Sequence, residues 1–90
     1  MAVRARVVFK GMVQGVFFRA NCEEKARSLE LSGYVRNLSN GSVEAVFEGE
    51  KEMIEEAIEW NRGGQPYARV TEVVVEWSKA TGEFSDFSRR

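Results

Sequence analysis

The chain has no histidine and only one cysteine, Cys22, among its 90 residues. Without histidine, Ser–His triads and histidine general bases are excluded, and the commonest metal ligand is missing. A single thiol can form neither an internal disulfide nor a thiolate zinc cluster. These absences narrow the chemistry that the chain can perform, and we expect Cys22 to be a small, inert core residue.

Long apolar runs and a strong net charge are also missing. No stretch approaches the roughly 18 apolar residues of a membrane span, and no apolar run of signal-peptide length follows residues 1–10. The 13 basic and 14 acidic side chains give a net charge of −1, which argues against a general nucleic-acid binder. We therefore expect a cytoplasmic protein with neither a membrane nor a nucleic-acid partner.

The charge is unevenly distributed along the chain. Residues 1–41 carry seven basic and three acidic side chains, whereas residues 42–90 carry six basic and eleven acidic ones. An anion-binding site is therefore expected in the first half.

Alternation of apolar and polar residues marks four strands, since side chains point to opposite faces of a sheet in turn. They are expected over residues 3–9, 34–38, 43–48 and 69–78. The dipeptide Asn40-Gly41 is a strong hairpin signal between the second and third strands. Phe84–Phe87 suggests a short additional strand at an edge.

Two helices are expected between these strands. The first follows a loop that contains Gly15 and carries an apolar stripe from Phe18 to Leu29. Ser32-Gly33 is expected to end it, because glycine readily adopts a left-handed cap. The second helix is expected over residues 50–62.

The resulting order, βαββαβ, predicts an α+β fold of the ferredoxin-like type. In this two-layer sandwich, two helices cover one face of a four- to five-stranded antiparallel sheet with the strand order 4-1-3-2. We expect one domain over residues 1–90. This fold serves many functions, so the site must decide which one applies.

The loop before the first helix has the features of a phosphate cradle. It reads Gly11-Met12-Val13-Gln14-Gly15-Val16-Phe17-Phe18-Arg19. A loop that ends on a helix N-terminus presents unpaired N–H groups, and the helix dipole favours an anion there. Arg19 adds a guanidinium that can hold two phosphate oxygens. The alternative is a tight β–α turn with a solvated arginine.

Two motifs in the chain resemble the signatures of the acylphosphatases. The first is the loop from Gly11 to Arg19, and the second runs from Gly33 through Tyr34-Val35-Arg36-Asn37 to Gly49. The resemblance extends over about residues 3–78. It implies a monomer that hydrolyses the carboxyl–phosphate bond of small acylphosphates, without a metal or a cofactor.

The resemblance also implies roles for single residues. Arg19 matches the catalytic arginine that binds the phosphoryl group, and Asn37 matches the asparagine that orients the attacking water. The matching phosphate-binding turn comprises Met12, Val13, Gln14, Gly15, Val16, Phe17, Phe18 and Arg19. Within it, Gln14 is expected to tie the loop's own backbone together rather than to contact the substrate.

Two positions depart from the family pattern. Gln65 stands where members often have proline, which we expect to affect only the stiffness of a loop. The ending from Phe84 to Arg90 lacks the usual apolar residue and terminal tyrosine, which puts the packing of a last strand in question.

Physical chemistry is compatible with this reaction in a protein without histidine. Phosphoryl transfer passes through a loose transition state, so catalysis relies on positioning and electrostatics. The conjugate acid of the leaving carboxylate has a pKa of about 4. The carboxylate therefore leaves unprotonated at neutral pH, and no general acid is needed.

Two other functions remain open at this point. One is a catalytically silent module that keeps the anion site but has lost turnover. The other is a reader of single-stranded RNA on the same scaffold, which needs aromatic side chains and a basic platform on the sheet. Glu44, Glu72 and Glu76 on the expected strands oppose binding of a polyanion.

Overall fold

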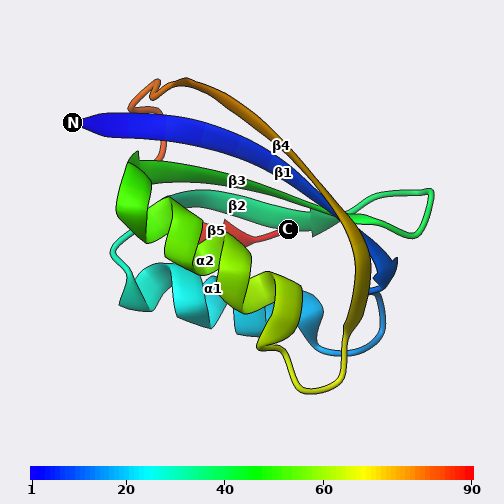
Figure 1. Ribbon diagram of the computed structural model, residues 1–90. Coiled ribbons are helices and arrows are strands. Elements are labelled where there is room, and N and C mark those ends of the chain that lie inside the picture. The colour runs from blue at the N-terminus through cyan, green and yellow to red at the C-terminus, as the bar shows by residue number, and fades with distance from the viewer.

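The computed structural model describes residues 1–90 and contains a five-stranded sheet with both helices on one side (Figure 1). The elements are β1 (Ala2–Met12), α1 (Phe18–Ser28), β2 (Ser32–Asn37), β3 (Val43–Glu50), α2 (Lys51–Gly63), β4 (Arg69–Lys79) and β5 (Phe87–Arg89). The sheet order is β4-β1-β3-β2-β5. The ferredoxin-like α+β arrangement and the strand order 4-1-3-2 are therefore confirmed.

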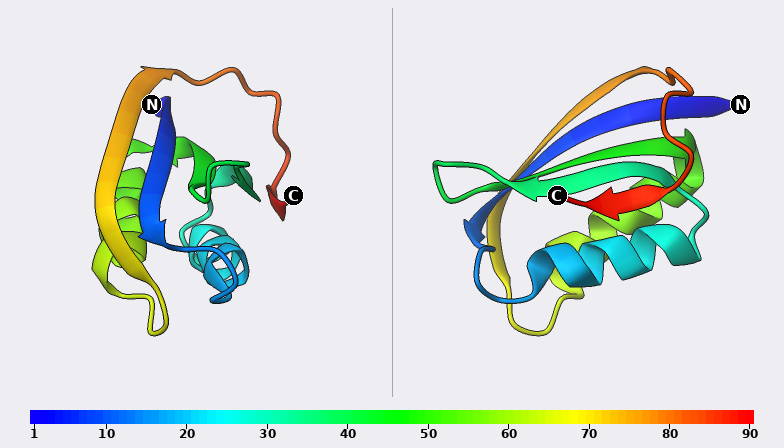
Figure 2. Two further views of the ribbon diagram at one scale, coloured as in Figure 1. Left: turned by 90° about the vertical axis from the view of Figure 1, so that its right-hand side faces the viewer. Right: turned by 180° about the vertical axis from the view of Figure 1, so that it is seen from behind.

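The fifth strand lies parallel to β2, so the prediction of a wholly antiparallel sheet was wrong. Gly33 pairs with Phe87, and Val35 pairs with Arg89. The segment after β4 crosses over the end of the sheet and reaches its opposite edge, where β5 lies (Figure 2). Because β4 runs opposite to β2, a chain that turns back at the end of β4 enters the far edge of the sheet parallel to β2. The strand also begins at Phe87 and not at Phe84.

The first strand is longer than its alternating core. Its pairing with β4 continues to Met12, after a register shift between Lys10 and Gly11. A shift of this kind is a β-bulge, which lets a strand bend and continue. The loop to α1 therefore begins at Val13, and Met12 belongs to the strand.

The first helix ends earlier than expected and without a glycine. Its last residue is Ser28, and Glu30 adopts the left-handed conformation, with φ of 58°. The N–H of Leu31 donates to the carbonyl of Ala26, and that of Glu30 to Arg27, each at 3.0 Å. This is a Schellman motif with glutamate at the position that glycine usually takes.

The predicted glycine cap was wrong for this reason, since Gly33 already lies in β2.

Neither helix is long and apolar enough to cross a membrane.

The core lies between the helices and the inner face of the sheet. Phe47 and Phe87 stack with ring centroids 5.5 Å apart, and Phe9 and Phe18 lie at 5.2 Å. Aromatic pairs of this kind add about 1 kcal/mol each to the burial of their surface. Cys22 is buried in the same core, as expected, and burial raises the pKa of its thiol. The last strand is thus well packed through Phe87.

On the outer face of the sheet, Glu44 is 3% exposed and lies between two arginines. Arg6 and Arg36 each donate a hydrogen bond from Nε to its carboxylate at 2.6 Å. Burial alone would raise the pKa of Glu44, but the hydrogen bonds and charges of both guanidiniums outweigh it and hold the pKa below its usual range. The carboxylate is therefore charged and paired in the folded protein.

Glu48 forms a second buried carboxylate on this face. It accepts hydrogen bonds from the main-chain N–H groups of Thr81 and Gly82, at 2.9 and 3.1 Å, and from Arg4 at 3.2 Å. Burial alone would raise the pKa of Glu48, but these donors outweigh it and the pKa is lowered. Glu48 thereby holds the segment that leads from β4 to β5.

We predict that Glu44→Gln lowers the free energy of unfolding by about 2 kcal/mol at pH 7, because it weakens two charge-assisted hydrogen bonds. The folded-state pKa of Glu44 is lowered, so its stabilisation is complete above the unfolded-state pKa of about 4.3. It is lost as the pH falls through the folded-state pKa. Urea unfolding at pH 7 and pH 3 should show the difference from wild type shrinking with acidity.

The control for this measurement is Glu76→Gln. Glu76 is exposed and pairs with Arg6 at 3.2 Å, so its loss should cost less than about 1 kcal/mol. An effect of Glu44→Gln that is equally large at pH 3 would contradict the role given to its charge.

Candidate active site

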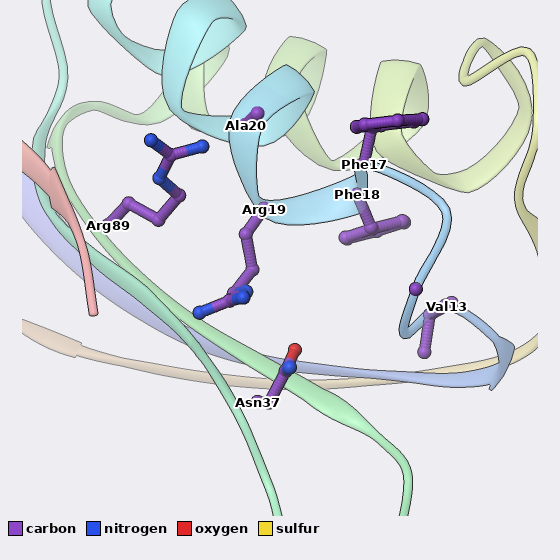
Figure 3. A pocket seen from close by; sticks show the side chains of 8 residues that line it. Val13, Phe17, Phe18, Arg19, Ala20, Asn37 and Arg89 are labelled. Atoms are coloured by element: carbon purple, nitrogen blue, oxygen red, sulfur yellow. The ribbon is translucent and has the colours of Figure 1, made fainter.

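A cavity of about 250 Å³ opens where the β1–α1 loop, the first turn of α1, the end of β2 and strand β5 meet (Figure 3). Its lining residues are Val13, Gly15, Phe17, Phe18, Arg19, Ala20, Asn37 and Arg89. The fold therefore brings Arg19 and Asn37, which belong to two separate sequence motifs, to one place.

Arg19 and Asn37 reach into this cavity from different elements. Arg19 lies on the first turn of α1, and Asn37 is the last residue of β2, paired with Val43. Figure 3 shows their side chains approaching each other from opposite sides of the cavity. Arg19 also donates a hydrogen bond from Nη1 to the main-chain oxygen of Arg90, at 2.7 Å. This bond orients the guanidinium beside β5.

The loop before α1 leaves several main-chain donors free. None of the N–H groups of residues 14–17 donates a hydrogen bond within the protein. Gly15 and Phe17 both have positive φ, 76° and 64°. Left-handed residues next to right-handed ones turn successive N–H groups into a concave anion-binding nest.

The N-terminus of α1 adds to this positive field. Phe17 occupies the position before the helix and makes no side-chain capping bond, and the first turn contains no acidic residue. Uncapped N–H groups carry the positive end of the helix dipole. The loop, the helix end and Arg19 together form an environment suited to an anion.

Gln14 connects the loop to the β2–β3 hairpin. Its Nε2 donates hydrogen bonds to the carbonyl oxygens of Leu38 and Ser42, both at 2.8 Å. The expectation that Gln14 ties the loop's own backbone was therefore wrong, because its partners belong to another segment. Leu38 directly follows Asn37, so this contact fixes the loop relative to Asn37.

Three residues of the expected phosphate-binding turn do not line the cavity. Met12 is an exposed residue of β1, paired with Arg69. Val16 packs against the hydrophobic core, and Gln14 is engaged with the hairpin. Val13, Gly15, Phe17, Phe18 and Arg19 do line it.

Gln65 also has a larger part than sequence reasoning gave it. It is 6% exposed, and its Nε2 donates to the carbonyl oxygen of Phe18 at 3.1 Å and to Oδ1 of Asn61 at 2.7 Å. The expectation that it affects only loop stiffness was wrong, because its side chain turns inward and supports the start of α1. Proline could not make these bonds.

Sequence reasoning missed two further lining residues, Ala20 and Arg89. Arg89 reaches the cavity only because β5 pairs with β2 in parallel, a contact that no local pattern signals. Ala20 follows Arg19 on the helix and could have been found from that position. The structure brings together no three acidic or thiol side chains that could hold a metal ion.

Comparison with known proteins finds acylphosphatases that match nearly the whole chain. The acylphosphatase family model matches residues 5–89. The acylphosphatase of Aeropyrum pernix is 53% identical over 89 residues, which are 98% of this chain and 88% of that protein.

Solved structures of acylphosphatases have the same fold as this chain. The acylphosphatase from Bacillus subtilis superposes with a TM-score of 0.93 at 31% identity, covering 98% of both chains. That from Coxiella burnetii gives a TM-score of 0.90 at 42% identity, covering 99% of this chain and 93% of the other. This chain belongs to the acylphosphatase family.

Proposed function

We propose that this protein hydrolyses the carboxyl–phosphate bond of small acylphosphates to a carboxylate and phosphate. The observation that carries the proposal is the meeting of Arg19 and Asn37 in one cavity, beside an uncapped helix N-terminus. The reaction proceeds by in-line attack of water, and it uses neither a metal nor a cofactor.

The phosphoryl group binds to the loop and to Arg19. The free N–H groups of Gly15 and Phe17 and those of the first turn of α1 receive its oxygens, and the Arg19 guanidinium takes two more contacts. These donors are in place before the substrate arrives, because Gln14 and the Arg19–Arg90 bond hold them. Preorganised donors of this kind stabilise charge that spreads over the phosphoryl oxygens in the transition state.

Asn37 directs the water. Its carboxamide faces the cavity from the end of β2, opposite Arg19 (Figure 3). The water oxygen forms a bond to phosphorus while the bond from phosphorus to the acyl oxygen breaks, and the carboxylate leaves with the electron pair. The water gives its protons to the phosphate product and to solvent, and a loose transition state needs little deprotonation beforehand. An amide that only aims the water therefore suffices.

The proposal extends to the domain organisation, oligomeric state, location and partners of the protein. Residues 1–90 act as one domain, as a monomer in the cytoplasm, on a small molecule and without a nucleic-acid partner. Support comes from the shared core, which joins both helices with strands β1, β2, β3 and β5, and from the single, buried thiol. The exposed carboxylates of Glu72 and Glu76 on the outer face of the sheet oppose binding of RNA.

Two substitutions separate phosphate binding from turnover. Arg19→Ala should lower kcat/KM for benzoyl phosphate by about 10³-fold and also weaken inhibition by inorganic phosphate, because it removes a contact to the phosphoryl group. Asn37→Ala should lower kcat by at least about 10²-fold and leave phosphate inhibition within about twofold. Initial rates of phosphate release in EDTA, with phosphate as inhibitor, measure both.

Equal loss of phosphate affinity in the two variants would contradict the assigned roles. Wild-type protein that binds phosphate but releases none from benzoyl phosphate would identify a silent anion-binding module instead.

Gln14→Ala tests how the loop and Asn37 are held at a fixed spacing. The free loop should misplace the phosphoryl group relative to the water, so kcat should fall about tenfold while phosphate inhibition changes less. In an Asn37→Ala background the same substitution should lower kcat no further, because the aligned partner is already gone. Equal effects of Gln14→Ala in both backgrounds would show that it acts only on stability.

A further inference from the structure

The cavity contains a second cationic side chain that the proposed reaction leaves unused. Arg89 lines it together with Arg19, but enters from β5 instead of α1. Loop N–H groups, the helix end and Arg19 already provide donors for one phosphoryl group. The presence of another guanidinium therefore calls for a separate explanation.

Arg89 has no hydrogen-bond partner in the protein. Its closest acidic neighbour is Glu23, whose Oε1 lies 3.9 Å from Nε of Arg89. The other oxygen of Glu23 lies 3.3 Å from Arg27, so its charge is shared. Arg19, by contrast, donates to the oxygen of Arg90 at 2.7 Å. The guanidinium of Arg89 thus has only this long ion pair with Glu23 and keeps its N–H donors for an anion from solution.

The fold nevertheless fixes the place of Arg89. On one side of it, Phe87 is fully buried and stacks on Phe47. On the other side, the N–H of Arg90 donates to the carbonyl of Val35 at 2.8 Å. The main chain of Arg89 is therefore held at the cavity edge, and only its half-exposed side chain can move.

The two guanidiniums address different parts of the cavity. Figure 3 shows that of Arg19 turned toward Asn37, and that of Arg89 turned toward the first turn of α1, away from Asn37. The attacking water and the leaving oxygen stand roughly in line on opposite sides of phosphorus. If Asn37 directs the water, the acyl group lies on the side away from Asn37, which is the side that Arg89 faces.

We propose that Arg89 determines specificity by binding a second anionic group on the acyl part of the substrate. The favoured substrates are acylphosphates whose acyl chain carries a further carboxylate or phosphate. A guanidinium matches both groups through two parallel hydrogen bonds. The inference rests on the hydrolase activity proposed above and goes beyond it by naming the class of acyl group.

The test uses pairs of probes that differ in one charged group. Adipoyl monophosphate carries a free carboxylate at the far end of a flexible chain, and its methyl ester is the uncharged match. An acylphosphate with a terminal phosphonate, beside its methyl esters, covers the phosphate-like case. The values of kcat/KM for each probe are compared among wild type, Arg89→Gln and Arg89→Lys.

Arg89→Gln should lower kcat/KM for the charged probe about tenfold more than for its ester, as expected for loss of a charge-assisted hydrogen bond. Arg89→Lys should retain part of the preference, since it keeps the charge but not the fork. The preference of the wild type should weaken as salt is added. Whichever charged probe shows the larger effect identifies the second group as carboxylate or phosphate.

Arg90→Gln is the matched control. It removes the same charge from the neighbouring residue, whose guanidinium lies over the ring of Tyr34 at 4.1 Å from the centroid. This variant should change both members of a probe pair alike. Hydrolysis of the ester by Arg89→Gln also shows that the variant is folded.

Equal losses for both members of a pair in Arg89→Gln would place Arg89 on the phosphoryl group and overturn the inference. No change for either member would overturn it too. A wild-type protein that hydrolyses neither the ester nor the charged probe would instead refute the hydrolase function on which the inference rests.

Discussion

The hydrogen bonds from Gln14 to the hairpin carbonyls fix the β1–α1 loop in space, and the candidate site depends on this contact. Two further bonds complete the support. Gln65 holds the carbonyl of Phe18, and the oxygen of Arg90 holds the guanidinium of Arg19. The β1–α1 loop and the start of α1 are thus held by the hairpin, by the α2–β4 connection and by Arg90, which follows β5. Rigid support from three elements suits a reaction whose catalysis is mainly positioning.

The two faces of the sheet contribute in different ways. The inner face is apolar and packs against both helices, and the ring pair of Phe47 and Phe87 joins the central strand to the last one. The outer face has no helix over it, and its buried carboxylates Glu44 and Glu48 are satisfied by arginines and main-chain donors. A chain of this size has few helices to cover a sheet, so ion pairs take that place on one side.

Local periodicity was sufficient to place the first four strands and both helices along the chain. The two motifs were sufficient to single out Arg19 and Asn37. The features that were missed depend on contacts between distant segments. The parallel pairing of β5, and with it the arrival of Arg89 in the cavity, follows from packing that no short pattern encodes. Likewise, the inward turn of Gln65 depends on a carbonyl of α1. The end of α1 was misplaced because Glu30 takes a conformation that sequence rules reserve for glycine.

The hydrogen bonds from Thr81 and Gly82 to the carboxylate of Glu48 have a consequence for catalysis in acid. Those residues lead to β5. Arg90 follows this strand directly, and its main-chain oxygen accepts the hydrogen bond from Arg19. Protonating Glu48 would weaken this tether without touching the cavity itself. A carboxylate remote from the cavity therefore contributes to how firmly the guanidinium of Arg19 is held, and its protonation in acid loosens that hold.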